Sequence, residues 1–315
     1  MKHLFIVNPV AGGKKSRPAE TVETIRRFMD GHGGDYDIYV TKAPMDACVR
    51  IREAADGCTE DLRVYACGGD GTLNECVNGA AGRAGVSVTC YPCGTGNDFI
   101  RTFGERDAAL FRSLEQLVEG FVRPIDVINC DGRYGVNICS VGFDARVGTD
   151  VHKYSGIPLI GGAAGYVVSL GVNLVRGITQ QMKMVLPDLT EEKKYTLICA
   201  CNGRFYGGGF NPVTDAMPDD GLMNILAVNA MSPLKVPALI GKYAKGRYRE
   251  MSDCITRYDS DRLELSSPEE FVVNIDGEAV FTDHITFALE HNRLSFLFPR
   301  DMEFYRPAAD GGAAL

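Results

Sequence analysis

Short apolar runs alternate with amphipathic segments through the first third of the chain. β-Branched and aromatic residues dominate the short runs, which predict strands at 3–9, 36–40, 62–67 and 86–91. The segments between and after them predict helices at 18–31, 43–57, 72–79 and 106–120. In the first helix, Val22, Ile25, Phe28 and Met29 share one face, and Gly31 is expected to end it. This alternation predicts an α/β domain with a parallel sheet between two layers of helices.

The pattern changes after about Val122, where strand-like runs follow one another with few helices between them. Gly, Asn, Asp and Pro bound these runs, which occupy 123–132, 134–141, 181–187, 195–203, 222–229, 261–267, 271–276, 279–290 and 294–299. The Asp276-Gly277 pair is typical of a tight hairpin. We therefore predict two domains, 1–123 and 124–315. The second is a mainly antiparallel β-sandwich whose C-terminal end is free to pack back on the first, with a cleft between the domains.

Composition narrows the class of protein. The 315 residues carry a formal net charge of −8, which argues against a nucleic-acid partner. Eleven scattered cysteines and an N-terminus without a secretory signal favour reduced thiols in the cytoplasm. The segment 154–175 has no charged residue, but its glycines and proline favour a loop and a buried helix over a membrane span. Lining an acyl pocket is its alternative role.

Three glycine-rich turns follow predicted strands, at Asn8–Lys15, Gly68–Glu75 and Pro92–Arg101. The carboxyl ends of parallel strands meet at one sheet edge, so we expect the turns to converge there. Glycines let backbone N–H groups approach a phosphate closely, and a helix N-terminus adds a favourable field. The spacings match neither a P-loop nor a dinucleotide-binding fingerprint.

Asp70 lies in the middle of the second turn, where a polyanion is expected. Three roles remain open for its carboxylate: a helix cap, a ligand of Mg²⁺ against phosphates, or an acceptor for the proton of an attacking hydroxyl. Phosphoryl transfer needs the last two. Thr72, Asn74 and Thr95 would add neutral donors for phosphate or ribose oxygens.

The turn "GGDGTLNECVNG", with "NPVAGGKK" before it and "CGTGNDFIR" after it, resembles the diacylglycerol kinase catalytic-domain family, in its soluble bacterial lipid-kinase branch. "VGFDARV", "GGGFNPVTDAMPDDGLMNILAV" and "NIDGEAV" extend the resemblance over nearly the whole chain. Sphingosine kinases are similar, and NAD kinases more distantly so. The resemblance implies ATP and Mg²⁺ as cofactors, and transfer of the γ-phosphoryl group to a lipid hydroxyl, with diacylglycerol as the expected acceptor and phosphatidic acid as the product.

The resemblance also assigns residues. It implies nucleotide binding by Asn8, Thr41, Gly68, Gly69, Asp70, Gly71, Thr72, Leu73, Asn74, Glu75 and Thr95. It implies a structural Mg²⁺ site made by the Asp220 carboxylate and the carbonyls of Met217 and Leu222, a donor set suited to a hard cation. A plain Asp-Gly turn is the alternative for this segment.

The Asp276-Gly277-Glu278 tip resembles the catalytic carboxylate pair of the family. We predict Glu278 as proton acceptor, with Asp276 assisting it or helping to hold a catalytic Mg²⁺, and Asp70 acting from the opposite domain. The order of Glu278 and Asp276 stays open, and taken alone the tip is an ordinary hairpin.

The segment 233–250 is basic, and Val236, Leu239, Ile240 and Tyr243 fall at helical spacing within it. This pattern suits a helix lying on anionic lipid, and equally an ordinary surface helix with a basic C-terminal end. We therefore expect a cytoplasmic protein that meets its lipid substrate by peripheral contact with a membrane. An NAD kinase-like enzyme and a non-catalytic nucleotide- or lipid-binding regulator are the rival functions. The acceptor lipid and the oligomeric state, a homodimer included, stay open.

Overall fold

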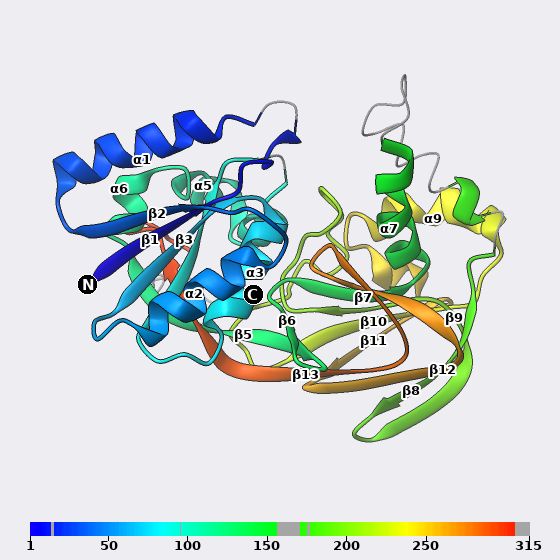
Figure 1. Cartoon of the computed structure of the whole chain (residues 1–315). Coiled ribbons are helices and arrows are strands. Elements are labelled where there is room, and N and C mark those ends of the chain that lie inside the picture. Colours follow the sequence, from blue (N-terminus) through cyan, green and yellow to red (C-terminus); the bar gives the residue numbers. More distant parts are fainter. Residues whose placement is uncertain (14–15, 95, 156–170, 175–176, 306–315) are drawn as a thin grey trace, which may run out of the picture.

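The computed structural model describes residues 1–13, 16–94, 96–155, 171–174 and 177–305. An N-terminal α/β lobe lies beside a C-terminal β-rich lobe, as predicted (Figure 1). The elements of the first lobe are β1 (Lys2–Val7), α1 (Pro18–His32), β2 (Asp35–Val40), α2 (Asp46–Asp56), β3 (Leu62–Gly68), α3 (Asp70–Ala80), β4 (Val86–Pro92), α4 (Asp98–Arg101), α5 (Gly104–Leu110) and α6 (Leu114–Val118).

The strands of this lobe pair in the order β2-β1-β3-β4, and all three pairings are parallel. Figure 1 shows α1 on one side of them and α2 and α3 on the other. On α1, Ile25 and Met29 are fully buried, while Val22 and Phe28 pack at the margin of the core. The helix continues past Gly31 and ends at Gly33, whose φ of 84° suits a residue without a side chain.

The single helix predicted at 106–120 is wrong. The chain forms two short helices, α5 and α6, because Ser113 adopts an extended conformation between them. Its hydroxyl accepts a hydrogen bond from the backbone N–H of Gln116, which starts a new helix rather than continuing the first.

The second lobe contains β5 (Phe121–Cys130), β6 (Arg133–Gly135), β7 (Ile138–Gly142), α7 (Phe143–Ser155), β8 (Gln180–Leu186), β9 (Leu189–Cys201), β10 (Met223–Asn229), η2 (Pro233–Lys235), α9 (Val236–Tyr243), η3 (Tyr248–Met251), β11 (Ile255–Ser260), β12 (Arg262–Ile275) and β13 (Glu278–Phe298). Pairings among its strands are antiparallel. Strand β11 was not predicted. Strands β12 and β13 each join two predicted runs across an irregularity in pairing.

One continuous sheet crosses both lobes. The sequence predicts a parallel sheet in the first domain and an antiparallel sandwich in the second, with a C-terminal end free to pack back on the first. Strand β13 pairs antiparallel with β12 and β5, and then parallel with β4 of the first lobe. Phe296 and Phe298 near its end are fully buried in the core of that lobe. The predicted boundary at Arg123 falls inside β5.

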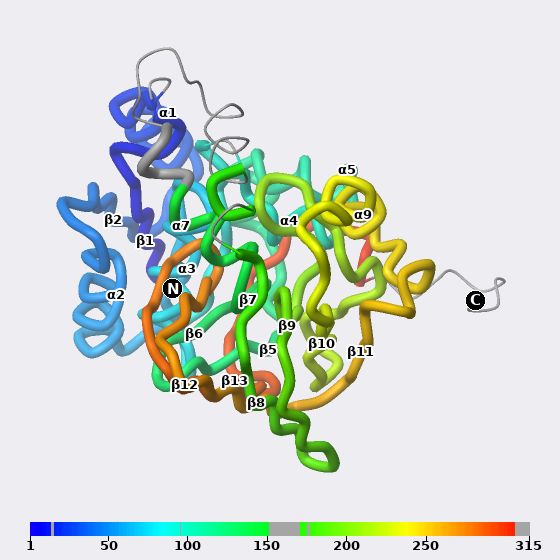
Figure 2. Tube along the Cα trace, turned by 90° about the vertical axis from the view of Figure 1, so that its right-hand side faces the viewer, coloured from blue at the N-terminus to red at the C-terminus, as the bar shows by residue number. Residues whose placement is uncertain are grey.

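Helices α7 and α9 lie at the end of the second lobe opposite to the β8–β9 hairpin (Figure 2). Most of the uncharged segment 154–175 lies outside the described residues, so its expected role is not addressed. No helix within the described ranges is long and apolar enough to cross a membrane.

Candidate active site

The three glycine-rich turns meet at the carboxyl edge of the parallel strands, as predicted. The side-chain amide of Asn8 donates to the Thr72 hydroxyl at 3.0 Å, which joins the turns after β1 and β3. A Cβ placed on Gly94 would lie 3.3 Å from the Gly12 nitrogen, so the turns after β1 and β4 are also in close approach. Thr41 directly follows β2, and its N–H donates to the carbonyl of Val7.

The second turn requires its glycines. A Cβ on Gly68 would lie 2.2 Å from the Thr72 hydroxyl oxygen, so only glycine fits there. Gly69 precedes α3, whose first turn presents backbone N–H groups without partners inside the helix. Those groups and the helix dipole suit an anionic ligand. Thr95 of the third turn lies outside the described residues.

The Asp70 carboxylate caps another helix. Its two oxygens accept the backbone N–H groups of Asn97 at 2.8 Å and Asp98 at 2.7 Å, at the start of α4. Burial and the neighbouring Asp98 carboxylate raise the pKa of Asp70. Of the three roles left open by the sequence, this conformation displays a capping role, toward α4 rather than toward its own helix.

Asp98 was not singled out by sequence reasoning, although it lies within the third motif. Its side chain is almost fully buried on the cavity wall. One oxygen accepts from Arg101 at 2.8 Å, and the other accepts the N–H of Gly208 from the second lobe at 2.7 Å. Asp98 therefore joins the third turn to the opposite lobe.

The Asp276 carboxylate accepts four hydrogen bonds. The backbone N–H groups of Val136, Asn137 and Ile138 donate at 2.6, 3.0 and 3.1 Å, and the Asn74 amide donates at 3.1 Å. These bonds fill the lone-pair positions of a carboxylate. Burial outweighs them and raises the pKa of Asp276 to about 6.

Glu278 differs from Asp276 in its exposure and in its hydrogen bonds. Its side chain is exposed and lines the cavity. One carboxylate oxygen lies 3.6 Å from the point that a Cβ on Gly71 would occupy, so it faces the first turn of α3 across the lobe junction. No hydrogen bond or ion pair ties this carboxylate to the part of the chain that the structure describes, which leaves it able to accept a proton.

Three predicted nucleotide-binding side chains point elsewhere. Leu73 is buried in the core, because the face of α3 that carries it packs on the sheet. Asn74 donates to the carbonyl of Tyr134 and to Asp276. Glu75 accepts the N–H of Ala47 in the first turn of α2, a favourable place for an acid.

The predicted metal site lies on the loop between β9 and β10. Asp220 accepts the N–H of Leu222 at 3.0 Å. Burial raises the pKa of both Asp219 and Asp220, and the nearby Asp126 carboxylate adds to each effect. Such concentrated negative charge suits a cation bound by oxygen. No group of three or more His, Cys, Asp or Glu side chains in the described ranges has an arrangement that could hold a metal. The site, with the Met217 carbonyl, therefore stays a prediction.

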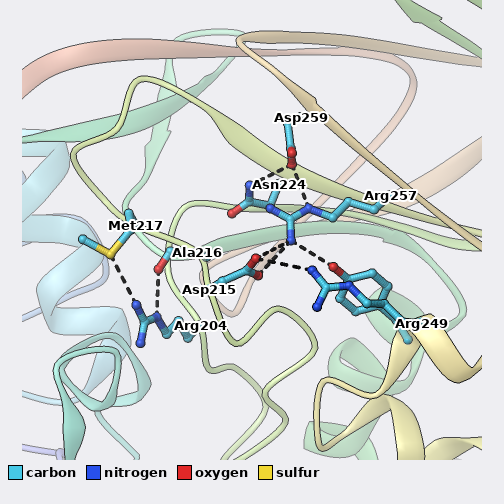
Figure 3. Close-up of polar contacts among 9 residues, drawn as sticks. Arg204, Asp215, Ala216, Met217, Asn224, Arg249, Arg257 and Asp259 are labelled. Atoms are coloured by element: carbon cyan, nitrogen blue, oxygen red, sulfur yellow. Dashed lines mark hydrogen bonds and ion pairs between the residues drawn. The ribbon is translucent and has the colours of Figure 1, made fainter. Parts of the chain in front are cut away.

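Arginines hold this loop in place (Figure 3). Arg257 binds Asp215 at 2.8 Å and Asp259 at 2.9 Å. Arg204 donates to the carbonyl of Ala216 at 2.8 Å, and its guanidinium lies 3.3 Å from the Met217 sulfur. Sequence reasoning missed both arginines, because neither lies in a motif.

A cavity of about 500 Å³ runs between the lobes and into the second. One end is polar and includes Asp70, Gly71, Asp98 and Glu278. The other end is apolar, between α7, β9, β10 and α9. Its walls include Phe143, Val147, Leu197, Phe210, Val228, Met231, Val236, Leu239, Ile240 and Tyr243.

The apolar face predicted to lie on lipid therefore has a different position. Val236, Leu239, Ile240 and Tyr243 of α9 line the cavity. The outer side of this segment carries Leu234, which is 89% exposed.

A second polar group lies within the apolar end. The Asp144 carboxylate accepts from the Tyr206 hydroxyl at 3.1 Å, and that hydroxyl lies 3.0 Å from the hydroxyl of Tyr243. Burial raises the pKa of Asp144 to about 6. Asp144 lies within the motif Val141–Val147, but the sequence alone assigns it no role.

Comparisons with known proteins agree with this architecture. The family model "Diacylglycerol kinase catalytic domain" matches residues 2–130, and "YegS C-terminal NAD kinase beta sandwich-like domain" matches residues 137–296. A Staphylococcus aureus (strain Mu3) protein named "Putative lipid kinase" is 27% identical over 240 residues, which are 76% of this chain and 78% of that protein.

Two solved structures from Bacillus anthracis str. Sterne share the fold. "Crystal structure of a putative diacylglycerol kinase" has a TM-score of 0.74 at 24% identity, over 94% of this chain and 96% of that one. "A putative diacylglycerol kinase" has a TM-score of 0.70 at 25% identity, with the same coverage. The chain belongs to the diacylglycerol kinase catalytic-domain family, with a C-terminal domain of the YegS type.

Proposed function

We propose that this protein transfers the γ-phosphoryl group of ATP to the hydroxyl of a lipid, with diacylglycerol as the first candidate acceptor. The observation that carries the proposal is one cavity, lined by described residues, that joins the glycine-rich turns and Glu278 to an apolar interior. A phosphorylated head and an acyl chain need those two environments, side by side.

The phosphates of ATP would bind at the turns after β1, β3 and β4. Backbone N–H groups at Gly69–Gly71 and the start of α3 would contact their oxygens. Asp70 and Asp98 would offer remaining lone pairs to Mg²⁺, since carboxylates fit a hard cation. When bound, Mg²⁺ neutralises charge on the phosphates. Asp220 with the carbonyls of Met217 and Leu222 would hold the structural ion.

Glu278 is the proton acceptor in this proposal. The proton of the lipid hydroxyl passes to its carboxylate while the oxygen bonds to the γ-phosphorus, and the bond from that phosphorus to the bridging oxygen of ADP breaks. Asp276 is unsuited to this step, because its four hydrogen bonds leave no acceptor position free. Positioning and charge neutralisation supply most of the rate enhancement.

The lipid chain would enter between α7 and α9. The inner face of α9 would contact the chain, and the exposed Leu234 with the neighbouring Lys235 would contact an anionic membrane. Helix α9 would thereby connect the bilayer to the cavity.

Labelled ATP with Mg²⁺, offered to a panel of lipids in mixed micelles and to NAD, tests the proposal. A labelled lipid product from the wild type, lost in Glu278→Ala, supports it and identifies the acceptor. Label on NAD alone would favour an NAD kinase-like activity, as the description of the C-terminal family model also suggests. ATP binding without transfer to any acceptor would favour a regulator.

A further inference from the structure

Helix α3 carries two functions that are physically linked. The N-terminal turn presents Gly71 to the cavity, opposite the Glu278 carboxylate. One and two turns later, Asn74 and Asn78 project from the helix toward the second lobe. Because these asparagines are four residues apart, they lie on the same face of the helix.

Asn78 binds the backbone of Tyr134 as a neighbouring strand would. Its amide oxygen accepts the Tyr134 N–H, and its nitrogen donates to the Tyr134 carbonyl, both at 2.9 Å. Tyr134 lies in the short stretch between the two family models, at 2–130 and 137–296. The asparagine pair therefore ties α3 to β6 of the second lobe.

Asn74 also contacts the β12–β13 hairpin, which carries Asp276 and Glu278. One amide nitrogen donates to the Tyr134 carbonyl at 2.8 Å and to the Asp276 carboxylate at 3.1 Å. An amide has two donor hydrogens, so both are used. Its oxygen accepts from Asn78 at 3.2 Å, and the side chain is 3% exposed. Asn74 thus has no donor left for a nucleotide.

Asp276 transmits this contact to Glu278, two residues later. Its carboxylate also accepts the N–H groups of residues 136–138, so the hairpin tip, these residues of the second lobe and α3 share one group. Of these four hydrogen bonds, the one from Asn74 joins α3 to the hairpin. Their geometry sets where Glu278 lies relative to the first turn of α3.

We propose that Asn74 is a positioning residue, which holds the hairpin that carries Glu278 against the phosphate turn of α3. The expected effect on catalysis rests on the proposed kinase activity. The expected effect on the position of the hairpin rests on the hydrogen-bond network alone. Asn74 contacts neither reacting group. Its effect passes through Asp276.

Asn74→Ala tests this proposal, with Asn224→Ala as a matched control. Asn224 is another 3% exposed asparagine that donates to an aspartate, Asp259, at 2.9 Å, but this bond joins β10 to β11 rather than α3 to the hairpin. We expect kcat of Asn74→Ala to fall roughly 10²-fold, the size of effect that small misplacements cause. The KM for ATP should stay within about twofold, because no nucleotide contact is removed. Asn224→Ala should lose stability but keep its kcat.

Asn74→Asp covers the case in which the alanine variant fails to fold. It preserves volume but places a second carboxylate about 3 Å from Asp276, which repels the hairpin. We expect an equal or larger fall in kcat. Wild-type kcat in this variant, equal losses in Asn74→Ala and Asn224→Ala, or a raised KM for ATP with unchanged kcat would each overturn the proposal.

Hydrogen exchange separates failure of this inference from failure of the proposed function. In Asn74→Ala, the amides of residues 136–138 and the hairpin 274–280 should exchange about tenfold faster than in the wild type. Unchanged exchange would overturn the inference even if the enzyme is an active kinase. Faster exchange in a protein that phosphorylates no lipid would support the positioning role of Asn74 and reject the proposed kinase activity.

Discussion

The carboxylate of Asp144 and the hydroxyl of Tyr206 form a hydrogen bond of 3.1 Å inside the apolar end of the cavity. Asp144 lies in the first turn of α7 and Tyr206 in the loop between β9 and β10, 62 residues apart in the sequence. Burial raises the pKa of Asp144 to about 6, above the ordinary value of about 3.9 for an unfolded chain. Its protonation state thus differs between the folded and unfolded protein over a defined range of pH.

That difference makes stability depend on pH. Between about pH 4 and 6 the folded protein retains a proton on Asp144 that the unfolded chain has released. The Asp144 contribution to the free energy of unfolding therefore falls as the pH rises through this range, and it is constant above about pH 6. The full contribution is at most about 3 kcal/mol. Asp144→Asn should remove this part of the slope, as measured by urea unfolding at pH 5 and 7. Asp276 contributes a pH dependence of the same sign to the wild type and to Asp144→Asn, so the variant should keep a smaller slope. Identical slopes in the two proteins would contradict the prediction.

Asp70→Asn should destabilise the third turn as well as reduce activity. The two oxygens of Asp70 accept two backbone N–H groups, and asparagine would present its own N–H₂ to one of them. We expect a loss of about 1–3 kcal/mol in the free energy of unfolding. Asp188→Asn, at an exposed hairpin tip, is the control and should change stability by less than about 0.5 kcal/mol. A fully stable, inactive Asp70→Asn would instead indicate a purely catalytic role.

Asp70 also shows what the sequence could and could not predict. Convergence of the three turns was predictable, because parallel strands bring their carboxyl ends to one edge. The partners of the Asp70 carboxylate were not predictable, because they lie in the third turn, 27 and 28 residues away in the sequence. The pairing of Asn74 with Asp276 spans 202 residues and depends on how the lobes dock.

The orientation of α9 was ambiguous for a different reason. Its residues are apolar on most sides, so periodicity identifies the face that contains Leu239 and Tyr243 but not what covers that face. The packing of α7 beside α9 determines which side of α9 faces the cavity, and no pattern within 233–250 carries that information. Likewise, β13 crosses between lobes because its last residues, Phe296 and Phe298, fit the first core.

Glu278→Gln should lower kcat by about 10²–10⁴-fold without loss of stability. The expected size is that of removing a general base. Stability should be unchanged because the side chain is exposed and makes no hydrogen bond to the described residues. Glu270→Gln, exposed on the neighbouring strand, provides the comparison. If Glu278→Gln kept its kcat while Asp276→Asn lost it at equal stability, the proposed order of the two carboxylates would be wrong.

Mg²⁺ should raise the melting temperature through the loop that contains Asp220. A ligand that binds the folded state alone at 100 times its Kd adds about 2.7 kcal/mol of stability. We expect chelator to remove this gain, and Asp220→Asn to lack it, whereas Asp188→Asn should retain it. The carboxylates of Asp126 and Asp219 repel Asp220 without the ion, so Asp220→Asn should also be more stable than the wild type in chelator. A Mg²⁺-induced shift of equal size in Asp220→Asn would place the ion elsewhere.

Leu234 of η2 and Leu239 of the adjoining α9 have different surroundings, so they separate membrane contact from substrate binding. Leu234 is 89% exposed, and Leu239 lines the cavity. Leu234→Ser should weaken sedimentation with anionic vesicles roughly tenfold, since burial of a leucine side chain contributes about 1.5–3 kcal/mol. It should leave turnover of a water-soluble short-chain acceptor and the melting temperature unchanged, because no protein contact is lost. Leu239→Ser should retain vesicle binding but raise the KM for the same acceptor. Equal effects of both variants on both measurements would show that membrane contact and substrate binding are not divided between η2 and α9.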